Sequence, residues 1–280
     1  METTGDSVPV MVTEPSRGMA SLHLALKDLK DALSIWPLWT FMARHDIRSR
    51  YNRSVLGPLW LIVSLVVQIG AIGVVWGALL KQEPRVFVPH ITLGLIAWTL
   101  LRGILGDSCQ CFVVANRYIT QTRRPMATFV FQLVARNVLI FAHSLVVYLA
   151  VALLFQVPLG PAVLLAVPGT LLALLAVSWV PLLLGPLGAR LRDLNQIAQS
   201  LLQVVFFVTP VMWSADMLGR RAFIASLNPL THLLALVRDP LRGQMPEAVS
   251  WYIAIAIAVA GWAVAILVFA RLRRRIPYWL

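Results

Sequence analysis

Long stretches without charged residues recur along the chain and predict membrane-spanning helices. Residues 54–80 contain no Asp, Glu, Lys or Arg, and the same holds from Asn137 to Ala189. A helix needs roughly 20 apolar residues to cross the hydrocarbon layer. The longer stretch therefore accommodates two helices, joined by a turn at 156–161 where proline and glycine cluster. The whole pattern predicts six spans, at residues 54–80, 86–115, 126–155, 162–188, 194–215 and 248–270.

The segments outside these windows predict three further features. Residues 1–30 begin without an apolar run, so we expect a cytoplasmic tail that is disordered at its start. Residues 31–53 place Trp36 and Trp39 at helical spacing opposite basic side chains, which predicts an amphipathic helix in the cytoplasmic interface. A packed juxtamembrane helix without a special role is the alternative. Residues 216–247 hold apolar pieces too short to cross, which predicts re-entrant helices on the outer side.

The composition supports this interpretation. Hydrophobic residues make up 59% of the 280 residues and charged residues only 13%, whereas a soluble domain carries about 25% charged residues. This excludes a soluble globular protein, a disordered chain and a coiled coil, and predicts an all-α polytopic membrane protein. Lys and Arg total 24 against 12 Asp and Glu, and they concentrate before the first span, at 116–125 and at 271–280. This distribution places both termini in the cytoplasm and does not call for a nucleic-acid partner.

Polar side chains recur on single faces of three predicted spans. Residues three or four apart share a helix face, and an unpaired polar group is costly in lipid. We therefore expect these side chains to line a water-filled channel, although hydrogen bonding between helices is the competing interpretation. The channel-lining candidates are Trp60, Ser64, Gln68, Gln132, Arg136, Asn195, Gln196, Gln199 and Gln203.

The remaining cysteines and charged residues of the second predicted span do not indicate a functional site. Cys109 and Cys111 lie one residue apart without partner ligands, so we expect two small buried side chains and no metal site. Arg102 and Asp107 are five residues apart, about 140° around a helix by its 3.6-residue turn, and do not form an ideal pair. We expect a structural or interfacial role for them. No phosphate-binding loop of the type G-x-x-x-x-G-K-[ST] is present.

Several motifs together carry a family resemblance. They are RYNRSVLGPLW at Arg50–Trp60, the segment Asn116–Pro125, Asn228-Pro229 followed by Leu241-Arg242-Gly243, and the end Arg275–Leu280. As a set over about residues 30–280, they resemble permease subunits of type 2 ABC exporters for lipid-linked polysaccharides. That family exports O-antigens, capsules, teichoic acids and the mycobacterial galactan precursor.

The resemblance implies a multi-pass protein of the bacterial inner membrane that exports a polyprenyl-diphosphate-linked glycan. Two copies would form a homodimer with the channel at its seam, and two separate ATPase subunits would bind ATP and Mg, so this chain would have no cofactor or catalytic residue of its own. The loop 116–125 would be a coupling helix that contacts the ATPase, through Arg117, Tyr118, Arg123 and Arg124; simple positive-inside topology is the alternative. The interface helix would meet membrane lipid, and its Arg44, Arg48, Arg50 and Arg53 are candidates for the lipid diphosphate.

Three other functions remain open at this point. A drug or small-molecule permease could use the same ABC fold. A proton-coupled secondary transporter would need membrane-embedded acids, and Asp107 is the one available. An enzyme would have to use Asp107, His143, His232 and Asp239, which lie on different spans or loops without a nucleophile motif.

Overall fold

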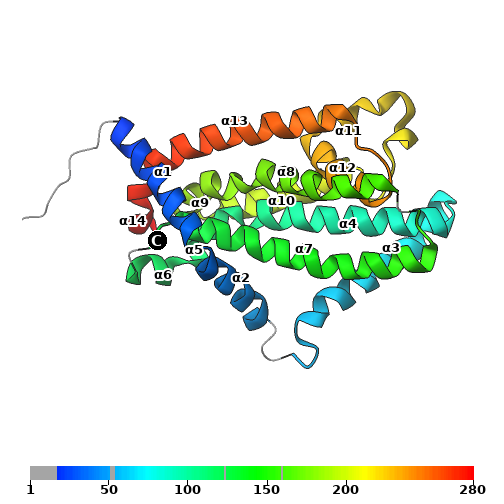
Figure 1. The fold of residues 1–280 in the computed structure, drawn as a ribbon, viewed down its shortest axis with the longest axis horizontal. Helices are drawn as coiled ribbons and strands as arrows, with labels where there is room; N and C mark the ends of the chain where they lie inside the picture. The colour runs from blue at the N-terminus through cyan, green and yellow to red at the C-terminus, as the bar shows by residue number, and fades with distance from the viewer. Residues whose placement is uncertain (1–17, 51–53, 123, 159) are drawn as a thin grey trace, which may run out of the picture.

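The computed structural model describes residues 18–50, 54–122, 124–158 and 160–280, and this part of the chain is helical throughout without a strand (Figure 1). The longer helices are α1 (Gly18–Ser34), α2 (Trp36–Arg50), α3 (Trp60–Leu80), α4 (Pro84–Asp107), α7 (Ala127–Phe155), α8 (Ala166–Ser178), α9 (Val180–Arg190), α10 (Leu194–Val208), α12 (Pro229–Leu241) and α13 (Ala248–Leu272). The shorter ones are η1 (Gly57–Leu59), η2 (Ser108–Gln110), α5 (Cys111–Val114), α6 (Asn116–Gln121), η3 (Pro161–Leu165), η4 (Ala215–Arg221), α11 (Phe223–Leu227), η5 (Arg273–Arg275) and α14 (Ile276–Trp279).

Five helical stretches of the described chain are long and apolar enough to cross a membrane. They are Gly57–Leu79, Pro84–Gln121, Ala127–Phe155, Pro161–Arg190 and Ala248–Trp279. The structure thus confirms the all-α class and the multi-pass character.

The fifth expected span, residues 194–215, has a shorter helix than the sequence pattern predicts. Helix α10 has 15 residues and ends at Val208, below the roughly 20 that a crossing helix needs. The physical reason is Pro210: the residue before a proline is disfavoured in helical conformation, and Thr209 is extended at φ −82° and ψ 134°.

The N-terminal segment contains a helix that the sequence analysis did not predict. Helix α1 lies within the expected tail, and its Ala25, Leu29 and Ala32 are buried against α7 and α13. The expected interface helix at 31–53 is instead divided, since α1 ends at Ser34 and α2 begins at Trp36. Pro37 in the first turn of α2 fits such a helix start. Residues 51–53 lie outside the described part.

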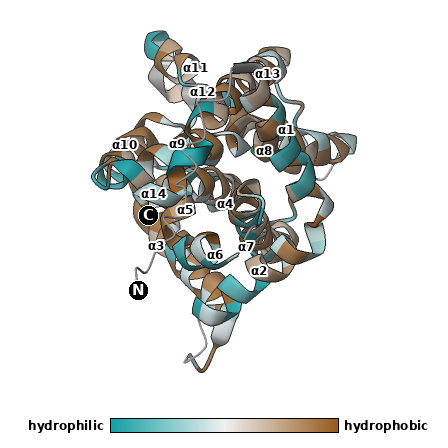
Figure 2. Cartoon of the chain, turned by 90° about the vertical axis from the view of Figure 1, so that its left-hand side faces the viewer, coloured by the Kyte–Doolittle hydropathy of each residue, from teal (hydrophilic) through white to brown (hydrophobic). Residues whose placement is uncertain are grey.

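Helix α4 lies in the interior of the bundle and α3 lies at its edge. In Figure 2, which looks along the helices from the end that carries α6 and α14, α4 is surrounded by the other helices. Of the apolar window in Pro84–Gln121, 72% is buried, against 11% for the window in Gly57–Leu79. Helix α4 packs against α7, α12, α10 and α3. The exposed sides of α3 are therefore available for lipid or another chain.

Glycines allow close approach where helices meet the backbone of other segments. A Cβ atom on Gly94 of α4 would lie 2.1 Å from the carbonyl oxygen of Val211, and one on Gly188 of α9 would lie 2.1 Å from that of Cys109. Small residues at such contacts are typical of membrane helix packing, where close backbone approach supplies the attraction. The bundle therefore depends on these positions remaining without a side chain.

We expect Gly94→Ala to lower the free energy of unfolding by about 2 kcal/mol, a typical cost of overpacking. The added Cβ would clash with the carbonyl oxygen of Val211, and this backbone group cannot change rotamer as a side chain could. Titration with SDS in mixed micelles would measure this loss. Gly70→Ala on α3 is the matched control, since a Cβ there meets nothing within 4 Å. Equal stability of the two variants would contradict the close contact.

The segment between α10 and α13 forms short helices, as the sequence predicts. Helix α11 has 5 residues and α12 has 13, and α12 packs against α8, α13 and α4. The side chain of Asn228 caps α12 by accepting a hydrogen bond from the Leu230 amide at 3.0 Å. On the same helix, Arg238 donates to the carbonyl of Pro210 at 2.8 Å. Re-entry of this segment into the membrane stays a prediction.

Candidate transport cavity

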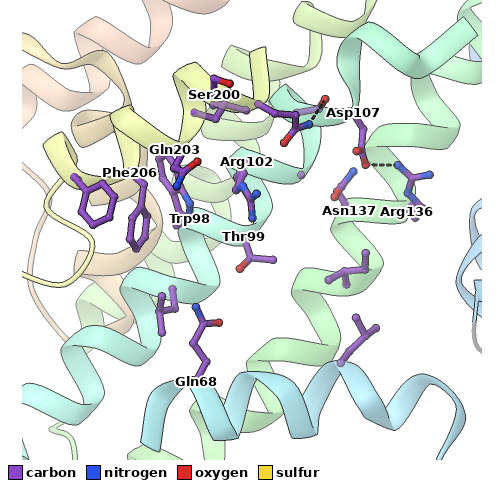
Figure 3. Close-up of a pocket in the computed structure, with 18 of the residues that line it drawn as sticks. Gln68, Trp98, Thr99, Arg102, Asp107, Arg136, Asn137, Ser200, Gln203 and Phe206 are labelled. Atoms are coloured by element: carbon purple, nitrogen blue, oxygen red, sulfur yellow. Dashed lines mark hydrogen bonds and ion pairs between the residues drawn. The ribbon is translucent and has the colours of Figure 1, made fainter. Parts of the chain in front are cut away.

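A polar cavity of about 780 Å³ lies between α3, α4, α7 and α10. Figure 3 shows that each of these helices contributes polar side chains to it, among them Gln68 from α3, Arg102 from α4, Asn137 from α7 and Gln203 from α10. The surrounding helices are apolar on average, so these residues gather the polar groups of the spans around one space. A space of this size and polarity can hold water or a hydrophilic solute within the bundle.

The three glutamines of α10, Gln196, Gln199 and Gln203, line this cavity, as the sequence pattern places them on one face. Gln199 donates to the carbonyl oxygen of Gly106 on α4 at 2.9 Å, so it joins the two helices. Gln196 and Gln203 are exposed, and their side chains make no hydrogen bond within the described residues. Gln199 therefore makes the hydrogen bond between helices that is the alternative to channel lining, whereas Gln196 and Gln203 can contact a solute in the cavity.

The other channel-lining candidates divide between several environments. Gln68 and Arg136 line the cavity, whereas Trp60, Ser64 and Asn195 are not among its lining residues. The Ser64 hydroxyl donates to the Trp60 carbonyl of its own helix at 2.7 Å. Channel lining by these residues stays a prediction.

Gln132 lines a neighbouring cavity of about 370 Å³ rather than the main one. Its amide donates to the carboxylate of Asp46 on α2 at 2.7 Å. Arg50 and Arg136 line both cavities, so the two spaces adjoin beside these residues.

An ion-pair cluster joins three helices at this point. The guanidinium of Arg136 on α7 lies 2.6 Å from the carboxylate of Asp107 on α4 and 3.7 Å from that of Asp46 on α2. The sequence indicated that Arg102 and Asp107 do not form an ideal pair, but it did not identify Asp46 or the pairing of Asp107 with Arg136. Two opposite charges within spans were the available signal; their alignment depends on how α4 faces α7.

Aromatic residues cover another part of the cavity wall, and the sequence analysis did not identify them. Trp98 of α4 and Phe206 of α10 have ring centroids 5.4 Å apart, and Phe206 and Phe207 meet edge to face at 5.4 Å. All three line the cavity, and Figure 3 labels Trp98 and Phe206 in its wall. Flat apolar rings beside free amides are suited to molecules with both C–H faces and hydroxyl groups.

The arginines proposed for a lipid diphosphate lie at different places. Arg50 lines the cavity, whereas Arg44 and Arg48 are exposed on α2 and line none of the described cavities. Arg53 lies outside the described residues.

The expected coupling segment forms α6, with Arg117 and Tyr118 exposed on it and Arg124 exposed beyond it. Arg123 lies outside the described residues. Roles in coupling to an ATPase stay predictions.

The remaining candidates are engaged in local contacts. Cys109 and Cys111 are buried free thiols, which confirms their expected burial. His232 makes hydrogen bonds with Ser250 and Ser226, and Asp239 pairs with Arg238 at 2.9 Å. His143 contacts the Leu139 carbonyl of its own helix. In the described ranges, no group of three or more His, Cys, Asp or Glu side chains could hold a metal ion.

The sequence of this chain is similar to those of known transport proteins. Residues 37–241 match the model of the family described as ABC-2 type transporter. The chain is similar to the O-antigen export system permease protein RfbA of Myxococcus xanthus, with 23% identity over 197 residues that cover 69% of this chain and 75% of the relative. It is also similar to two proteins of that name from Klebsiella pneumoniae, with 21% identity over 211 residues and 23% over 213, each covering 73% of this chain and 80% of the relative. The family match spans most of the chain and includes α3, α4, α7 and α10, which enclose the cavity. This multi-pass membrane protein therefore belongs to the ABC-2 type transporter family.

Proposed function

We propose that the chain is the permease subunit of an ATP-driven ABC exporter that moves a polyprenyl-diphosphate-linked polysaccharide out of the cytoplasm across the bacterial inner membrane. The polar cavity between α3, α4, α7 and α10 is the observation that carries this proposal. Its free amides suit sugar hydroxyls and its aromatic wall suits sugar C–H faces. Similarity to O-antigen export permeases supports a glycan as the cargo.

A homodimer with the channel at its seam accounts for the exposed walls of the cavity. Gln196 and Gln203 on α10 are exposed although they lie among apolar residues. Lipid is a poor neighbour for such amides, whereas a second copy of the chain would enclose them in a shared aqueous path. Helix α3, the least buried span, flanks the same cavity and would form the other side of the seam.

Placement of both ends of the bundle on one side of the membrane is supported by a contact between them. The guanidinium of Arg273, which follows α13, lies 3.1 Å from the carboxylate of Asp28 on α1. The two ends of the bundle therefore lie on one side, which requires an even number of crossings. Helix α10 and the residues that follow it would supply the sixth.

Two ATPase subunits, which bind ATP and Mg, would complete the transporter. They would dock on the cytoplasmic end, where α6 exposes Arg117 and where Arg124 follows. Basic side chains there can pair with acidic ones on a partner. Helices α1 and α2 provide further surface on the same end (Figure 1).

Purification of the complex tests this function. We expect the chain to co-purify with an ABC ATPase at equal stoichiometry and polyprenyl-diphosphate glycan to raise ATP hydrolysis. A variant of the ATPase that lacks its phosphate-loop lysine is the control. Stimulation by small apolar compounds but not by the glycan lipid would favour a drug permease. Purification without an ATPase, with flux driven by a proton gradient, would contradict the ABC mechanism.

Disulfide cross-linking tests the seam. Two differently tagged copies would carry Val67→Cys on α3 and Phe207→Cys on α10, both strongly exposed apolar positions. Phe207 lies four residues from Gln203 and therefore on the face of the amides. We expect a disulfide between the copies, with little background because the native cysteines are buried. Leu153→Cys on α7, which is also strongly exposed but lies outside the proposed seam, is the control. Equal cross-linking by the control would contradict this arrangement.

We expect leucine substitutions to separate the two roles of the α10 amides. Gln203→Leu should lower glycan-stimulated ATP hydrolysis severalfold without loss of stability, since this amide has no hydrogen bond within the described residues. Gln199→Leu should lower the free energy of unfolding by about 1 kcal/mol, because it removes the bond to Gly106. ATPase assays and SDS titration measure the two effects, and equal destabilisation by both variants would show that Gln203 also packs.

A further inference from the structure

Arg102 is a charged residue inside a membrane span that has no partner of its own. It lies in Pro84–Gln121, is exposed to the cavity, and makes no ion pair or hydrogen bond with any residue that the structure describes. Figure 3 shows its guanidinium in the open space of the cavity, near Thr99 and Gln203. A charge within a membrane is costly unless it is compensated. The position of Arg102 therefore calls for a counter-charge that the described chain does not supply.

The nearby acids are already engaged. Three arginines and one aspartate line the cavity, and that aspartate, Asp107, is bound by Arg136 at 2.6 Å. The next acid, Asp46, also lies beside Arg136 and accepts a hydrogen bond from Gln132. The cavity thus keeps an excess of positive charge around Arg102.

Neutral hydrogen-bond donors accompany this charge. Thr99 precedes Arg102 by three residues on α4 and therefore lies on the same face, and it is exposed in a stretch where its neighbours are buried. The amides of Gln68 and Gln203 face the cavity from α3 and α10 (Figure 3). A guanidinium presents a planar fork of N–H donors that matches two oxygens of a phosphate.

We propose that Arg102, together with Gln68, Thr99 and Gln203, forms a binding site for a phosphate-type oxyanion inside the cavity. The natural source of that anion rests on the proposed function: it is either the diphosphate of the lipid carrier or a phosphate group within the exported glycan. The site lies deeper along α4 than Asp107, which is five residues closer to the end of that helix. An anion that enters from the end that carries Asp107 would pass the Arg136 cluster first.

Direct binding to the full chain tests the site. The chain would be placed in phosphatidylcholine nanodiscs without an ATPase subunit, so that no nucleotide site contributes. Calorimetry would then measure the affinity for inorganic diphosphate and for geranylgeranyl diphosphate. We expect Arg102→Gln to weaken the binding of at least one probe by about tenfold to a hundredfold, the usual effect of losing hydrogen bonds to a charged group.

Two variants serve as controls. Arg102→Lys keeps the charge without the fork, and we expect intermediate affinity. Arg85→Gln removes one charge from the exposed start of the same helix and should leave affinity unchanged. Because the Arg102 guanidinium makes no bond within the described chain, Arg102→Gln should unfold at the same SDS concentration as the unchanged protein.

The two probes distinguish the sources. Arg102-dependent binding of both indicates that the phosphate group alone is recognised, whereas binding of geranylgeranyl diphosphate alone indicates the lipid carrier. Equal affinities of Arg102→Gln and the unchanged chain, or no binding of either probe, would overturn the site. If the complex exports a glycan lipid but the affinity for the diphosphate probes does not depend on Arg102, the anion site is wrong and the proposed function stands. If binding depends on Arg102 but no glycan lipid stimulates the complex, the proposed function fails and the site stands.

Discussion

Arg136→Met is expected to lower the free energy of unfolding by about 3 kcal/mol, because it leaves two carboxylates without their common cation. Removing one member of a buried ion pair typically costs about 3–5 kcal/mol. The lower end applies here because the side chain of Asp107 is 46% exposed to the cavity, while that of Arg136 is only 16% exposed. The cluster also joins α2, α4 and α7, so its loss should loosen this end of the bundle. SDS titration of the purified chain measures the effect.

Further variants identify the ion pair as the cause. Arg136→Lys keeps the charge and should lose much less stability. Arg136→Met combined with Asp107→Asn removes both charges, and we expect it to be more stable than Arg136→Met alone, the pattern of a coupled pair in a double-mutant cycle. Additive losses from the two substitutions would contradict the coupling.

Asp28→Ala is expected to destabilise the chain by about 3 kcal/mol, because this one carboxylate joins α1, α7 and the residues after α13. It accepts hydrogen bonds from the backbone amides of Ala127 at 2.9 Å and Met126 at 3.2 Å, and lies 3.1 Å from Arg273. The amides belong to the start of α7, where N–H groups have no partner within the helix and favour a negative charge. Each hydrogen bond to a charged group contributes about 1.5–3 kcal/mol. Loss of all three contacts should lower the unfolding midpoint in SDS and expose α1 to proteolysis.

The matched control for this prediction is Asp31→Ala, which removes an exposed carboxylate from the same helix and should be nearly neutral.

Burial raises the pKa of the Asp28 carboxyl, although the hydrogen bond from Ala127 and the charge of Arg273 act to lower it. The folded chain thus holds this proton up to a higher pH than the unfolded chain does, so the contribution of Asp28 to stability falls as the pH rises through the folded pKa. The neutral variant Asp28→Asn should therefore be milder than Asp28→Ala, and equal losses from Asp28→Ala and Asp31→Ala would contradict the role of Asp28.

Charge along the chain determined much of the architecture. The absence of charge in residues 54–80 and from Asn137 to Ala189, interrupted by a turn rich in proline and glycine, is a property of the sequence that any membrane fold must accommodate. The structure places membrane-length helices in both regions. The end of α10 was also open to prediction, because Thr209 precedes Pro210 and a residue before proline is disfavoured in helical conformation.

Burial of α1 could not be read from the sequence. Its apolar contacts are the small residues Ala25 and Ala32 with Leu29, set among charged side chains, so it resembles a solvated segment. The helix packs because α7 and α13 bring the start of one helix and a basic residue to Asp28. Only the tertiary structure brings these partners to Asp28, because they come from segments distant in sequence.

The site divides in the same way. Helical periodicity alone placed Gln196, Gln199 and Gln203 on one face, and the resemblance of the motifs indicated the family. Periodicity gives the faces of each helix but not the neighbour that each face meets. Only the packing of α4 against α7 and α10 decided that Gln199 donates a hydrogen bond to Gly106, that Arg136 pairs with Asp107, and that Arg102 faces open space. The reason is that these contacts depend on how helices distant in sequence are rotated against one another.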